Sequence, residues 1–215
     1  PDWREIAERA AAEAEKHVYA AGEPAVLAES VPGGTTTALL VLRALGYEGT
    51  VSSAGPENPL ALKEMIWRDS SRRLGISVGG LKGKGLEAAA AIGDPMQIAV
   101  AAFAAALPED VPITLAGGTQ MMAVAAVLRD MGVTRDILVA TTKYVRIDKT
   151  SNFDHYAEAI GVRGYAAPLD FTNSRFTGLS EYELGYIKEG VGAGGAVWYA
   201  EHEGISVAQV QKKTE

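Results

Sequence analysis

What the chain lacks already narrows its function. Its 215 residues include no cysteine, which excludes disulfides, thiolate-bound metals and a cysteine nucleophile. The three histidines, His17, His155 and His202, are too scattered for metal-ligand spacing. We therefore predict neither a metal site nor a cofactor.

Segments that would bind a membrane or a polyanion are missing as well. No apolar run has the length needed to cross a bilayer, and Pro1 to Glu5 lack the basic start and apolar centre of a signal peptide. The net charge of −7 opposes binding to nucleic acid, and no cluster of lysine and arginine offsets it. We expect a cytoplasmic protein with no nucleic-acid or membrane partner, whose ligands are small molecules.

Short apolar segments alternate with longer helical ones along the chain. The predicted strands lie near residues 26–29, 50–53, 112–116, 136–142 and 164–169. The predicted helices cover residues 2–20, 35–44, 60–74, 86–92 and 96–107, and one more ends at Met131. This alternation predicts an α/β, Rossmann-like fold of three layers, with a mostly parallel sheet and helices on both faces. We expect residues 1–215 to form one nucleotide-binding domain.

The most informative stretch runs from Glu29 to Thr36, where an apolar strand meets a glycine pair and restarts as a helix. Unpaired backbone N–H groups and the positive end of a helix can bind phosphate at such a turn. No lysine follows Gly34, which argues against an ATPase. Glu29 suits a ribose, because two vicinal hydroxyls can both donate to one carboxylate. An ordinary strand-to-helix turn would explain the glycines equally well, but Glu29 favours a nucleotide.

Two later stretches extend this pattern. The order strand, glycine pair, threonine, helix recurs at residues 112–131, and Gly117 there ends a predicted strand, as Ser53 and Thr141 do elsewhere. Ligands of parallel sheets bind at such carboxyl ends. Glu189 is enclosed by glycines and alanines, where lost solvation would raise its pKa and make it a better base near neutral pH. It could equally be a charged loop residue.

Taken together, these stretches resemble the nicotinate-nucleotide:dimethylbenzimidazole phosphoribosyltransferase (CobT) family, and especially its archaeal and cyanobacterial branch. The family's EMGIGNTT loop matches Glu29 to Thr36 without a gap, and its GEGTGAALA matches Lys188 to Ala196, which reads KEGVGAGGA. Its GGFEIAAMAGA resembles Gly93 to Phe103, and its strand ending in DGF resembles Ile113 to Thr119.

The resemblance implies a phosphoribosyl transfer in cobalamin lower-ligand synthesis. Nicotinate mononucleotide and a dimethylbenzimidazole-like base would give α-ribazole 5′-phosphate and nicotinate. By position, Glu189 matches the family's proposed catalytic base, and Glu29 matches the loop glutamate near the ribose. The residues that match phosphate-side segments are Gly33, Gly34, Thr35, Thr36, Ser53 and Lys63.

The chain also departs from the family pattern. Val31 replaces the first loop glycine, Gly34 an asparagine and Gly117 an aspartate, and the family's N-terminal segment has no counterpart here. The alternative function is therefore that of a truncated domain or homologue that binds a ribonucleotide without catalysis. The resemblance implies a homodimer, which the apolar stretches 96–107 and 121–127 also favour, because they exceed what one small sheet plausibly covers.

Overall fold

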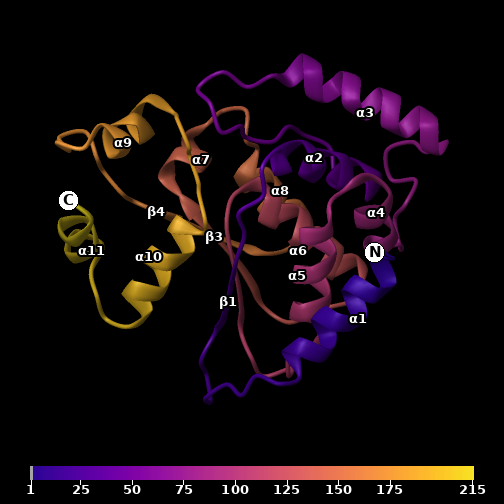
Figure 1. Ribbon diagram of the computed structural model, residues 1–215, viewed down its shortest axis with the longest axis horizontal. Coiled ribbons are helices and arrows are strands. Elements are labelled where there is room, and N and C mark those ends of the chain that lie inside the picture. Colours follow the sequence, from indigo (N-terminus) through magenta and orange to yellow (C-terminus); the bar gives the residue numbers. More distant parts are fainter. Residues whose placement is uncertain (1) are drawn as a thin grey trace.

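A four-stranded parallel sheet forms the centre of the computed structural model, which describes residues 2–215 (Figure 1). Within these residues the strand order is β1-β2-β3-β4. The strands are β1 (Ala25–Ala28), β2 (Ile113–Ala116), β3 (Ile137–Thr142) and β4 (Arg163–Ala167). All three strand pairs are parallel. Helices surround the sheet, which confirms the predicted α/β, Rossmann-like fold.

The six predicted helices are all present, and the helices that follow residue 131 were not predicted. Those before β2 are α1 (Trp3–Ala14), α2 (Gly34–Ala44), α3 (Leu60–Leu74), α4 (Gly85–Ile92) and α5 (Pro95–Ala106). Those after β2 are α6 (Thr119–Asp130), α7 (Lys143–Ile147), α8 (Phe153–Ile160), α9 (Thr177–Ser180), the 3₁₀ helix η1 (Glu181–Leu184), α10 (Ala193–His202) and α11 (Val207–Thr214). The first helix ends earlier than expected, because Ala14 is its last residue that packs into the core. Across residues 2–215, every helix is too short or too polar to cross a membrane.

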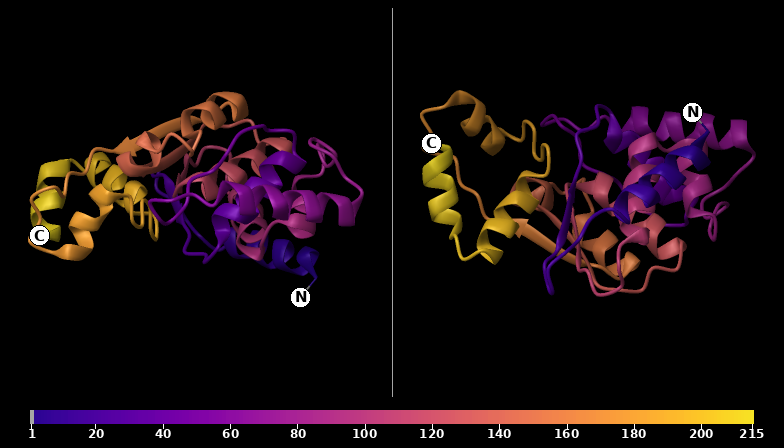
Figure 2. Two further views of the ribbon diagram at one scale, coloured as in Figure 1. Left: turned by 90° about the horizontal axis from the view of Figure 1, so that it is seen from above. Right: turned by 60° about the horizontal axis from the view of Figure 1, so that its bottom comes forward.

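The sheet has a different cover on each face. Right-handed connections between successive neighbouring strands place their helices on one face, and there α6 packs against β2 and β3 and α8 against β4. Helix α10 contacts all four strands and lies on the opposite side of the sheet (Figures 1 and 2). The C-terminal segment thus supplies the third layer.

The two apolar stretches that favoured a dimer are largely covered within the chain. Residues Met121 to Leu128 of α6 are fully buried between the sheet, α2 and α5. Helix α5 packs against α1, which shields it from solvent on its outer side. Burial of these helices therefore requires no second copy, and the homodimer stays a prediction of the resemblance.

Glycines allow α10 to lie directly on the sheet. A Cβ atom added at Gly194 would lie 2.0 Å from the carbonyl carbon of Thr141, and one at Gly195 would lie 2.2 Å from the Cβ of Ala116. Real Cβ atoms do not approach other atoms so closely, so only glycine fits at either position. This contact brings the loop that precedes α10 to the carboxyl ends of the strands.

The strand predicted at residues 50–53 was wrong: this segment is irregular. Its carbonyl oxygens are occupied by groups outside the sheet, because the carbonyl of Val51 accepts from the Asn58 amide and that of Ser52 accepts from Lys63. The carbonyl of Ser53 accepts from Lys188. The other predicted strands are present, with ends shifted by a few residues.

The packing of α10 generates the first prediction. Gly194→Ala should destabilise the fold by roughly 1–3 kcal/mol or more, because the new methyl group meets backbone that cannot move aside. Gly178→Ala is the matched control, since a Cβ atom at that helical position meets nothing within 4 Å. Urea unfolding of both variants measures the difference. Equal midpoints would contradict the close contact between α10 and β3.

Candidate functional site

A cavity of about 330 Å³ opens at the carboxyl ends of the strands. Four segments that lie far apart in the sequence surround it: the loop from β1 to α2, the irregular segment 52–54, the turn from β2 into α6, and the loop before α10. Its lining residues are Glu29, Ser30, Val31, Pro32, Gly33, Gly34, Thr35, Ser52, Ser53, Ala54, Gly118, Gln120, Lys188, Glu189, Gly190 and Val191. Most of the residues that the sequence singles out therefore meet at one place.

The loop after β1 has the backbone of an anion-binding turn. Gly33 has φ +76°, a left-handed conformation that favours glycine, and α2 begins at the next residue. The N–H of Gly34 donates to the carbonyl of Val31, and that of Thr36 donates to the carbonyl of Gly33. Within residues 2–215, the N–H groups of Gly33 and Thr35 have no acceptor. They can donate to a ligand.

Glu29 is held at the edge of this loop. One carboxylate oxygen accepts from the N–H of Val31 at 2.9 Å and from the side-chain amide of Gln120 at 3.1 Å. Burial raises the pKa of Glu29; the Val31 N–H lowers it in part, and the negative charge of Asp94 raises it further. Gln120 was not predicted as a site residue, although it directly follows the second Gly-Gly-Thr run.

Gly34 makes room for that amide. A Cβ atom at Gly34 would lie 2.1 Å from the Nε2 atom of Gln120. Gln120 also donates to the carbonyl of Val31 at 3.3 Å, so it links α6 to the loop. The packing of Gln120 therefore requires glycine at position 34, whether or not a phosphate binds there.

Glu189 lies on the loop before α10. Its carboxylate accepts from the Thr141 hydroxyl at 3.1 Å, from the N–H of Gly190 at 3.0 Å, and from the N–H of Gly194 at 3.4 Å. Burial raises the pKa of Glu189 to about 7, and these hydrogen bonds offset part of the rise. This is the direction that the glycine-rich surroundings predict.

The glycine pair after β2 separates the two glutamates. A Cβ atom at Gly117 would lie 3.5 Å from a carboxylate oxygen of Glu29, and one at Gly118 would lie 3.8 Å from the Cβ of Glu189. The two carboxyl groups therefore flank the end of β2 from opposite sides. Of this pair only Gly118 lines the cavity, whereas a Cβ atom at Gly117 would meet the Met121 side chain at 2.7 Å.

The loop that carries Glu189 is strained. Ile187 has φ +46° and Val191 has φ +48°, and both are β-branched residues, which rarely adopt a left-handed conformation. Each costs about 1–3 kcal/mol, and such strain clusters at functional sites. The two strained residues flank Glu189 on either side.

The remaining predicted residues occupy different places. Ser53 lines the cavity, and its hydroxyl donates to the carbonyl of Gly55 at 2.9 Å. Lys63 does not line it: its ammonium is buried and donates to the carbonyl of Ser52 at 2.7 Å and to Asn58 at 2.9 Å. Burial lowers the pKa of Lys63 to about 8. Lys63 thus supports the cavity wall from behind.

The last predicted residue, Thr36, lies just outside the cavity. It is in the first turn of α2, next to Thr35. Among residues 2–215, no group of His, Cys, Asp or Glu side chains is arranged to hold a metal ion.

The chain is similar in sequence to several known proteins. No protein-family model matches the chain. It shares 48% identity with a UPF0284 protein of Pyrococcus furiosus over 218 aligned residues, which cover the whole chain and 65% of that protein. The chain is related to the UPF0284 proteins.

Other UPF0284 proteins show the same pattern. One from Thermococcus gammatolerans is 46% identical over the whole chain and 64% of its own length. One from Methanosarcina mazei is 46% identical over 88% of the chain and 55% of its own length. The chain thus spans just under two thirds of the first of these relatives. The name UPF0284 states no reaction, so an activity has to be argued from the site.

The raised pKa of Glu189 predicts a pH-dependent stability. Because the folded-state pKa of about 7 exceeds the ordinary value of 4.5, Glu189 favours the folded state fully below pH 4.5, and this contribution is lost as the pH rises through 7. When the pH is raised from 5 to 8, the free energy of unfolding of Glu189→Gln should therefore increase relative to that of wild type, by up to about 3 kcal/mol.

Urea unfolding at the two pH values measures this gain. Glu158→Gln, at an exposed position on α8, is the control for general charge effects. A difference between wild type and Glu189→Gln that is the same at both pH values would rule out a raised pKa at Glu189.

Proposed function

We propose that this cavity binds nicotinate mononucleotide and transfers its phosphoribosyl group to a benzimidazole-like base. The observation that carries the proposal is the meeting of two carboxylates, Glu29 and Glu189, with free loop amides in one cavity at the strand ends. The resemblance to the phosphoribosyltransferase family supports the same assignment, because residues of three of the four matched motifs line this cavity.

The proposed binding mode follows from the loop after β1. The 5′-phosphate lies against the N–H groups of Gly33 and Thr35, at the positive end of α2. The ribose hydroxyls donate to the carboxylate of Glu29. Gln120 keeps that carboxylate in place.

In the proposed reaction the bond between ribose C1′ and the pyridinium nitrogen breaks, and its electron pair leaves with nicotinate. A ring nitrogen of the acceptor base forms the new bond to C1′, and the N–H proton of that base passes to Glu189. A general base works best when its pKa lies near the operating pH, which the value of about 7 satisfies. Glu189 later releases the proton to solvent.

A ribonucleotide-binding protein without catalysis is the second candidate. The loop after β1 and Glu29 suffice for binding, and Glu189 would then serve only to hold the loop against Thr141 and the first turn of α10. Adding nicotinate mononucleotide and dimethylbenzimidazole and then measuring released nicotinate separates the two candidates.

Two matched variants test the proposed roles. Glu189→Gln should lower turnover on the order of a hundredfold to ten-thousandfold, because it removes the general base. Its affinity for nicotinate mononucleotide should change little. Glu29→Gln should instead weaken that affinity and change turnover less, because the ribose contact exists before the chemical step.

Steady-state rates and calorimetric titrations measure both effects. Wild-type turnover should also fall as the pH drops below about 7, where Glu189 becomes protonated. Full turnover of Glu189→Gln would eliminate the proposed base. Nucleotide binding without nicotinate release by the wild-type chain would favour the binding protein instead.

A further inference from the structure

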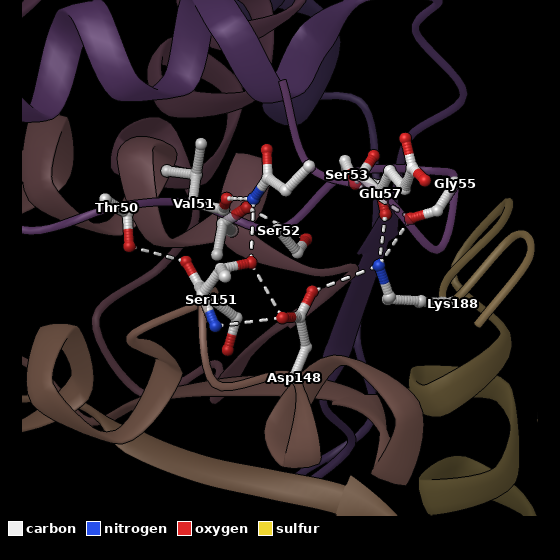
Figure 3. A network of polar contacts seen from close by, with 12 residues as sticks. Thr50, Val51, Ser52, Ser53, Gly55, Glu57, Asp148, Ser151 and Lys188 are labelled. Atoms are coloured by element: carbon white, nitrogen blue, oxygen red, sulfur yellow. Dashed lines mark hydrogen bonds and ion pairs between the residues drawn. The ribbon is translucent and has the colours of Figure 1, made fainter. Parts of the chain in front are cut away.

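The residue before Glu189 is a buried lysine with no role in the proposed reaction. The side chain of Lys188 is only 8% exposed. Its ammonium donates to the carbonyl oxygens of Ser53 at 3.1 Å and Gly55 at 2.7 Å, and it forms an ion pair with Asp148 at 3.1 Å (Figure 3). A buried ammonium is costly unless it is paired and hydrogen-bonded, and here all three partners come from distant segments.

The two adjacent side chains anchor the loop in different directions. Lys188 reaches the segment 53–55 and Asp148, whereas Glu189 reaches Thr141 and the first turn of α10. The main chain between them is fixed as well. The N–H of Ile187 donates to the carbonyl of Ala54 at 2.7 Å, and the carbonyl of Lys188 accepts from the Thr142 hydroxyl.

These contacts maintain the strained backbone of the loop. A left-handed β-branched residue persists only where its surroundings over-determine its conformation. Ile187 is flanked by the Ala54 contact on one side and the Lys188 contacts on the other. Without the lysine, fewer contacts hold Ile187 at φ +46°, and the loop can relax to another conformation.

We propose that Lys188, with Asp148 as its counter-ion, is a positioning residue that holds the Glu189 carboxylate in the cavity. This inference rests on the function proposed above and extends it to a cavity-lining residue whose ammonium is taken up by protein partners, Ser53, Gly55 and Asp148. The family motif GEGTGAALA has a glycine at this position, so the resemblance assigns Lys188 no role.

A second buried lysine provides a matched control. Lys63 donates to the carbonyl of Ser52, next to the carbonyl that Lys188 holds, and its side chain is also buried. It has no contact with the loop that carries Glu189. Lys63→Met therefore removes a comparable buried ammonium from the same wall and leaves the Lys188 contacts in place.

The first readout is the pKa of Glu189 itself, followed by carbon-13 NMR of glutamate-labelled protein, with Glu189→Gln to assign the signal. In the wild type the hydrogen bonds from Thr141, Gly190 and Gly194 lower the pKa of Glu189. In Lys188→Met the carboxylate should lose part of these hydrogen bonds. The pKa should therefore rise by about half a unit to one unit. Lys63→Met should leave it within about 0.2 of the wild-type value.

Asp148→Asn separates position from charge. Tyr182 is the other titratable group that faces Glu189, and it stays unchanged in every variant. If Lys188 acted only through its charge, removing the negative Asp148 would lower the pKa of Glu189. If Lys188 positions the loop, losing its counter-ion loosens it and the pKa rises. We expect the rise.

Turnover supplies the second readout. Lys188→Met should lower kcat at least about tenfold, with a smaller change in the affinity for nicotinate mononucleotide. The double variant Lys188→Met/Asp148→Asn removes both charges, so no unpaired charge stays buried if the single variant fails to fold. Unfolding curves confirm that each variant is folded.

The outcomes separate this inference from the proposed reaction. A wild-type pKa of Glu189 in both Lys188→Met and the double variant would overturn the role of Lys188. Equal changes of the Glu189 pKa in Lys63→Met and Lys188→Met would overturn it too. They would show that removing any buried ammonium from this part of the cavity wall disturbs Glu189. The expected pKa changes without nicotinate release, even by wild type, would support the role of Lys188 and contradict the reaction.

Discussion

Direct contact between α10 and the sheet is the constraint on which the site depends. Gly192, Gly194 and Gly195 lie so close to β1, β3 and β2 that a side chain at any of them would overlap Ala28, Thr141 or Ala116. Because the helix begins at these strand ends, the loop before it must cross the mouth of the cavity. The same first turn donates the Gly194 N–H to Glu189, so the contact that builds the third layer also orients the carboxylate.

Features that destabilise a fold are concentrated around this loop. Two left-handed β-branched residues, two buried lysines and a glutamate with a raised pKa lie within or behind the cavity wall. The core on the other face of the sheet shows the opposite pattern, since residues 121–128 of α6 are apolar and fully buried. Natural proteins break local rules mainly at functional sites and offset the cost elsewhere. The distribution of strain therefore indicates the same location as the motifs do.

Local patterns predicted most of the fold, and distant partners account for what was missed. Apolar periodicity located four strands and the helices up to Met131, because each depends on its own residues and on burial, but the later helices were not predicted. Residues 50–53 are of types that are common in strands, but three of their carbonyl oxygens accept hydrogen bonds from Asn58, Lys63 and Lys188. Lys188 is 135 residues away from Ser53 in the sequence. Gln120 lies 91 residues from Glu29. No local pattern reveals such pairs, whereas the glycines that adjoin Glu189 and the family resemblance both drew attention to that residue.

The two glutamates differ in the kind of donor that holds them, and this difference suits them to different roles. Glu29 accepts from the backbone N–H of Val31 and from the NH2 group of Gln120, and both hydrogen bonds favour the ionised carboxylate. Glu189 also accepts from a backbone N–H, that of Gly190, but it faces in addition the Thr141 hydroxyl, which can donate to a carboxylate and accept from a carboxylic acid. Its two contacts with the Gly194 N–H are long, at 3.4 Å, and hold the charged form only weakly. Two fixed donors thus hold Glu29 as an acceptor for a ligand's hydroxyl groups, whereas the Thr141 hydroxyl can bond to Glu189 in either protonation state.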